Sequence, residues 1–105
     1  MIDEEIRKTS SKINKTEYAI EKLQNLINVT NSALEKVIST ESITDTQILS
    51  GQTIDFGKME EMHSICSSII EDAENTINSC HNYIGKLNEY LNSLYEQRNQ
   101  MGGNW

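Results

Sequence analysis

The sequence predicts an all-α protein: an antiparallel two-helix hairpin of the coiled-coil type, which completes a helical bundle with a partner or a second copy. Proline is absent from all 105 residues, which favours long uninterrupted helices. Apolar residues recur in heptads along two long stretches, and one Ser- and Thr-rich segment separates them. The length limits the chain to a single domain, residues 1–105.

The first helix is expected over about residues 3–38. Two rows of residues repeat every seven positions, and β-branched side chains occur in both. They are Ile6, Ile13, Ile20, Ile27 and Leu34, and then Ile2, Thr9, Thr16, Leu23, Thr30 and Val37. Ala19, Leu26 and Ala33 widen the apolar stripe on one side. Asp3, Glu4 and Glu5 place negative charge at the positive end of the helix dipole.

Residues 39–55 are expected to form a packed connection, with one short helical turn near 45–49. Small polar residues there compete for backbone hydrogen bonds, and Gly51 favours a turn. Because the two helices are similar in length, they should fold back on each other in antiparallel fashion.

The second helix is expected over about residues 56–98. One row holds Met59, Cys66, Ala73, Cys80, Leu87 and Leu94, and a second holds His63, Ile70, Ile77, Ile84 and Leu91. A third row adjoins the second: Met62, Ile69, Thr76, Tyr83 and Tyr90. Residues 99–105 should form a frayed tail, because Gly102 and Gly103 stop the helix.

The apolar stripe of the second helix is wider than a two-helix contact needs. Three apolar positions in seven suit a bundle of three or four helices, so another helical chain should cover the remainder. The expected partner-binding residues are Met62, Ile69, Ile70, Ile77, Tyr83, Ile84 and Tyr90. The alternative from the residues alone is a monomer whose connection covers the rim.

The charge balance excludes several classes of function. Lys and Arg number 9 against 16 Asp and Glu, so the formal net charge is −7, which argues against nucleic acid. Residues 53–105 hold three basic and eight acidic side chains, so a basic partner surface would be attracted to the second helix.

No apolar run is long enough for a membrane span, and the acidic N-terminus lacks the features of a signal peptide.

Every histidine and cysteine lies on the second helix, so no catalytic cleft is expected. Cys66 and Cys80 lie fourteen residues apart in one row, too far for a disulfide within the helix, and are expected to be reduced core residues. His63 and Cys66 are spaced for zinc, but a complete site would need a second copy. We therefore expect no enzyme activity, no metal and no cofactor.

The end of the connection carries a motif, Leu49-Ser50-Gly51-Gln52-Thr53-Ile54-Asp55-Phe56. It resembles the turn of the WXG superfamily, the helical hairpins of type VII secretion. Their pattern is Trp-x-Gly, then a small residue and an aromatic residue that opens the second helix. Leu49 stands in the Trp position, and Gly51, Thr53 and Phe56 match the rest.

The family's secretion signal, Tyr-x-x-x-Asp/Glu, is not found, since Tyr90 precedes Leu94 and Tyr95 precedes Asn99 at that spacing. The chain therefore looks more like the small accessory partners of LXG-type toxins. The resemblance implies a targeting chaperone that binds the toxin's N-terminal helical domain and helps direct its export. It also implies a cytoplasmic location, with co-export left open. The alternative is a self-assembling structural coiled-coil protein without a client.

Overall fold

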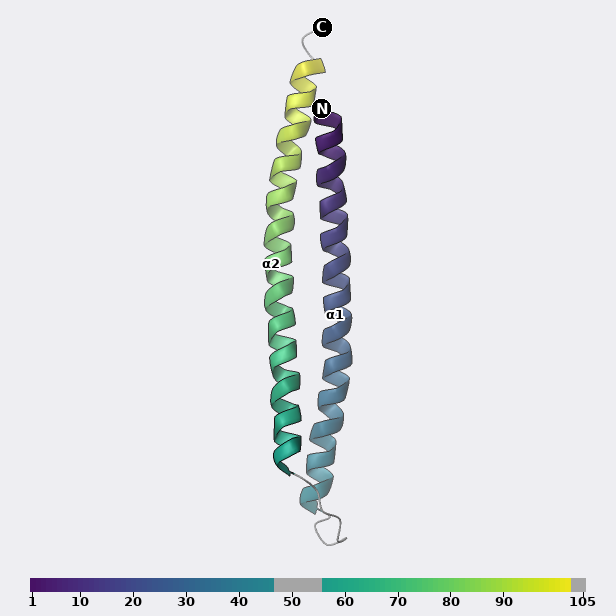
Figure 1. Ribbon diagram of the computed structural model, residues 1–105, viewed down its shortest axis with the longest axis vertical. Helices are drawn as coiled ribbons and strands as arrows, with labels where there is room; N and C mark the ends of the chain where they lie inside the picture. The colour runs from purple at the N-terminus through teal and green to yellow at the C-terminus, as the bar shows by residue number, and fades with distance from the viewer. Residues whose placement is uncertain (47–55, 103–105) are drawn as a thin grey trace. The chain divides into compact units, whose positions relative to one another are not determined.

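The computed structural model describes residues 1–46 and 56–102, and it shows an all-α, antiparallel two-helix hairpin. Helix α1 covers Ile2–Thr46 and helix α2 covers Phe56–Gly102. The hairpin divides into two units. Unit 1 combines Met1–Lys22 with Thr76–Trp105, and unit 2 is Leu23–Asn75. In each unit a stretch of α1 lies beside an antiparallel stretch of α2 (Figure 1).

Helix α1 ends eight residues later than the sequence predicted, so residues 39–46 are helical rather than part of a connection. This segment, Ser-Thr-Glu-Ser-Ile-Thr-Asp-Thr, holds neither Gly nor Pro. Ser, Thr and Asp cost up to about 0.7 kcal/mol each relative to Ala in a helix, so they weaken a helix without ending it. The rest of the predicted connection, 47–55, lies outside the described residues.

Helix α2 begins at Phe56 as predicted and continues to Gly102, four residues beyond the predicted end. Residues 99–102 are therefore helical rather than part of a frayed tail. Gly102 is the last helical residue, and Trp105 lies outside the described residues.

The four predicted heptad rows form the seam between the helices. We assign the row that begins at Ile6 on α1 and the row that begins at His63 on α2 to heptad position a. The rows that begin at Ile2 and Met59 take position d. Every member of these rows is buried or half-buried, so the predicted seam is confirmed.

The seam is only one layer of side chains thick. Its most buried apolar members include Ile20 on α1 and Ala73 and Leu94 on α2. Among the described residues no large side chain is less than 2% exposed. A pair of helices buries one face of each and leaves the flanks of the seam in solvent, because there is no second layer to cover them.

In unit 1, an ion pair between exposed side chains joins the beginning of α1 to the last turns of α2. An Arg98 guanidinium nitrogen of α2 lies 3.7 Å from an Asp3 carboxylate oxygen of α1. Both side chains are largely solvent-exposed, so this ion pair contributes less than about 1 kcal/mol. The hairpin is held by the apolar seam rather than by such pairs.

Candidate partner-binding surface

The structure separates the seven predicted partner-binding residues into two groups. Ile70, Ile77 and Ile84 are half-buried in the a row of α2, so they serve the hairpin's own seam. The other four are exposed: Met62, Ile69, Tyr83 and Tyr90. The exposed four belong to the third row, at heptad position g, and only they are available to another chain.

The g row is exposed because it borders the seam without entering it. A side chain at g precedes the a position by one residue and lies next to the d row, on one flank of the contact. The g row of α1 contains Ala19, Leu26 and Ala33, which are exposed as well. In an antiparallel pair the g rows of both helices flank the seam on the same side. We call the c and g positions of both helices in a unit its c/g side.

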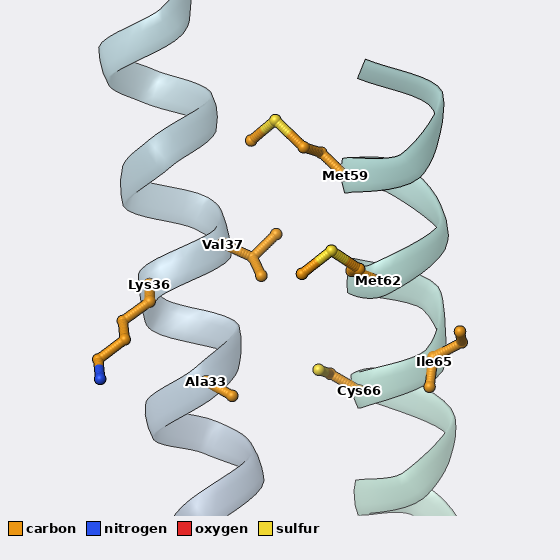
Figure 2. A pocket seen from close by; sticks show the side chains of 7 residues that line it. All are labelled: Ala33, Lys36, Val37, Met59, Met62, Ile65 and Cys66. Atoms are coloured by element: carbon orange, nitrogen blue, oxygen red, sulfur yellow. The ribbon is translucent and has the colours of Figure 1, made fainter. Parts of the chain in front are cut away.

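In unit 2 the c/g side contains an open apolar groove of about 420 Å³. Figure 2 shows Ala33 and Val37 of α1 pointing toward Met62 and Cys66 of α2. Met59 and Ile65 extend the apolar lining along α2, and Lys36 is the charged residue at its edge. The groove places g side chains of both helices together, as the antiparallel arrangement requires.

Sequence analysis missed part of this surface. Val29 and Ile65 occupy c positions and are 68% and 51% exposed. They did not appear as a row because most other c positions hold lysine or a small polar residue. The predicted antiparallel pairing could have revealed them, because it brings apolar residues at c positions of the two helices to the same side of the seam. Together with the g residues they give unit 2 an exposed apolar patch: Leu26, Val29, Ala33, Met62, Ile65 and Ile69.

The charges are divided between the two sides of the seam. All seven lysines of the chain lie at c or g positions. They are Lys8, Lys12, Lys15, Lys22, Lys36, Lys58 and Lys86, and all are exposed. Glu5 and Asp72 are the acidic side chains at c or g positions among the described residues.

This division changes the expectation about the partner's charge. Helix α2 is the more acidic helix, but most of its carboxylates face away from the c/g side. Glu60 and Glu74, for example, occupy e positions on the opposite flank. A partner that covers the apolar residues therefore meets lysines, and a basic partner is not favoured there.

The cysteines and histidines lie where the heptads predicted. Cys66 and Cys80 are free and half-buried in the d row, His63 is half-buried and His81 is exposed. In the described part of the chain, no three His, Cys, Asp or Glu side chains gather as a metal site. By position and burial, Cys66, Cys80 and His63 belong to the seam, and His81 lies on the surface.

The WXG-like turn motif cannot be compared with the structure. Leu49, Gly51 and Thr53 lie outside the described residues, and the Phe56 side chain does as well. Phe56 is nevertheless the first residue of α2, the position that the resemblance implies for the aromatic residue.

Comparison with family models, with curated proteins and with solved structures found no match. Neither α1 nor α2, over the residues described, contains a stretch apolar and long enough to cross a membrane.

Proposed function

We propose that this chain is a non-enzymatic helical adaptor whose c/g side covers apolar helices of a larger protein. The observation that supports the proposal is the exposed apolar patch of unit 2. Its residues come from both helices, and three of them, Ala33, Met62 and Ile65, line an open groove of the kind in which helical proteins bind an amphipathic helix. A contiguous patch of this kind on a small protein indicates a protein interface.

The energetics favour a partner that is itself apolar. Met62 and Ile65 are each about half exposed, so covering them removes roughly half of their apolar surface from water. Full burial of such a side chain is worth about 1.5–3 kcal/mol, so each contributes about 1 kcal/mol on docking. Burial of the unit 2 patch can therefore by itself stabilise a complex with an apolar partner.

We further propose that the client is the N-terminal helical domain of an LXG-type toxin, and that the adaptor helps direct the toxin to the type VII secretion machinery. The turn motif, the hairpin fold and the heptad pattern support this assignment, which the resemblance implies. The chain would act as a targeting chaperone in the cytoplasm, before export or together with its client.

A matched pair of variants tests the adaptor proposal. Ile65 lies at a c position and Ile38 at an e position, on opposite sides of the seam within unit 2. Their exposed fractions are similar, 51% and 44%, so replacement by serine makes the same chemical change on the two sides. We expect Ile65→Ser to weaken binding of the proposed client's helical domain about tenfold, because that surface is buried in the complex. Ile38→Ser should leave the affinity within about twofold.

Isothermal titration of the purified chain with that domain measures both affinities, and circular dichroism checks that each variant is folded. Equal effects of the two substitutions would contradict the assignment of the c/g side. Failure of the unmodified chain to bind the domain would contradict the proposed client.

A further inference from the structure

The c/g side of unit 1 differs in chemistry from that of unit 2. Tyr83 and Tyr90 are 46% and 47% exposed and lie one heptad apart on α2, with Ala19 on the facing side of α1. Five lysines share this side: Lys8, Lys12, Lys15, Lys22 and Lys86. Lys86 follows Tyr83 by three residues and precedes Tyr90 by four, so all three lie on one helix face.

The two sides of unit 1 carry formal charges of opposite sign. The c/g side holds five lysines and one carboxylate, Glu5, a formal charge of +4. The b, e and f positions hold six carboxylates and one arginine, Arg7, a formal charge of −5. The six are Asp3, Glu4, Glu17, Glu21, Glu89 and Glu96. The unit is thus strongly polarised across the seam.

Two of the lysines contact groups at the edge of this side. The Lys8 ammonium lies 3.8 Å from a Glu4 carboxylate oxygen, and that of Lys22 lies 5.0 Å from the centre of the Tyr18 ring. Lys12 and Lys15 are exposed near the middle of the α1 stretch of unit 1. Together with Lys86, which lies between the two tyrosines, they are therefore the lysines best placed to meet a partner.

We propose that the c/g side of unit 1 binds an acidic amphipathic helix of the partner, with apolar residues against Tyr83, Tyr90 and Ala19 and carboxylates against the lysines. The spacing of the tyrosines supports a helix, because a partner helix aligned with α2 presents the same face every seven residues. The lysines supply the charge complementarity that sets the sign of the partner. This inference rests on the proposed adaptor function and adds the chemistry of its client.

A second copy of this chain is a poor occupant of the same surface. Pairing two c/g sides of unit 1 would bring five lysines of each copy together around a small apolar centre. Like charges facing each other across an interface are unfavourable and suppress that pairing. The acidic partner is favoured because it neutralises the same lysines.

A lipid surface is also disfavoured. Helices that lie on membranes insert a large apolar face, and their binding strength scales with the apolar area buried. Among the described residues, the c/g side of unit 1 offers Ala19, two tyrosines and the terminal Met1 as apolar surface, while the other side carries six carboxylates. Anionic lipid therefore becomes an outcome of the test rather than the proposal.

The test uses the full chain and two variants with the same change in net charge. Lys12→Gln with Lys15→Gln removes two positive charges from the c/g side. Asn14→Asp with Asn82→Asp adds two negative charges on the opposite side of the same unit, since these residues occupy b and f positions and are exposed. Circular dichroism confirms that both variants remain helical.

The probes are two fluorescein-labelled amphipathic peptides about four heptads long, with the same apolar residues and either Glu or Lys at the flanking positions. Vesicles of phosphatidylcholine with phosphatidylserine form a third probe. We expect the Glu peptide to bind at least about tenfold tighter than the Lys peptide. The lysine variant should lose about fivefold of that affinity, and the asparagine variant should keep it within about twofold.

Equal binding of the two peptides, binding of neither, or equal losses in the two variants would overturn the proposal. So would tight binding to the anionic vesicles without binding of the Glu peptide. If the Glu peptide binds as expected but the toxin domain does not bind, the acidic-helix inference stands and the proposed client is wrong.

Discussion

Thr9 shows how single polar residues are accommodated in the seam. It is 3% exposed, and its hydroxyl donates a 2.7 Å hydrogen bond to the carbonyl oxygen of Glu5, one turn earlier in its own helix. That carbonyl already accepts a bond from the helix backbone, so the hydroxyl is satisfied locally rather than across the seam. The hydroxyl therefore adds little to the packing of α1 against α2.

We accordingly expect Thr9→Val to raise the free energy of unfolding by about 1 kcal/mol. Valine keeps the β-branched shape and replaces the hydroxyl by a buried methyl group. Urea denaturation measures the change. Thr16→Val is the control, because the same bond to Lys12 occurs there at a less buried position, and its gain should be smaller. A loss of stability in Thr9→Val would mean that the hydroxyl has an essential role in the seam.

Helix α2 contains one interior glycine, Gly85, whose role the sequence left open. A glycine within a helix can allow a neighbouring helix to approach closely, because it has no side chain. The structure puts it at an exposed b position. Apart from its chain neighbours and the backbone of its own helix, no atom of the described residues lies within 4 Å of where a Cβ would stand. The hairpin itself therefore gains no close approach from this glycine.

Gly85→Ala should stabilise the chain by about 0.5–1 kcal/mol, because alanine lowers the entropy of the unfolded chain and meets open space in the folded one. Thermal unfolding followed by circular dichroism provides the measurement. Binding to the client should be unchanged, since b positions lie away from the c/g side. A destabilised variant would show that another group occupies this space.

The helices were predictable to different degrees. The heptad rows alone located the seam, because a row that faces another helix must be apolar or small at every turn. The end of α1 was not predictable in the same way, since a run of Ser and Thr is compatible with a turn and with a helix. The charge division was hidden for a different reason. The separation of lysines from carboxylates involves both helices, and it can be seen only when the antiparallel pairing brings the c and g positions of both to one side.

At the scale of the molecule, each unit presents one side that is suited to a partner and one that is suited to water. Unit 2 offers aliphatic residues such as Met62 and Ile65, and unit 1 offers tyrosines among lysines. The opposite sides carry most of the carboxylates and maintain solubility. A thin seam with one exposed apolar flank is the arrangement expected of a hairpin that completes its core with another chain.

The most direct measurement of this claim is hydroxyl-radical footprinting of the chain, alone and in complex with the helical domain of the proposed LXG-type client. Met62 and Tyr83 report on the c/g side, and Tyr95, which is exposed at an e position, reports on the opposite flank. We predict that oxidation of Met62 and Tyr83 is fast in the free chain and falls at least about fivefold in the complex. Oxidation of Tyr95 should change little. Slow oxidation of Met62 and Tyr83 in the free chain, or equal rates with and without the partner, would contradict the account.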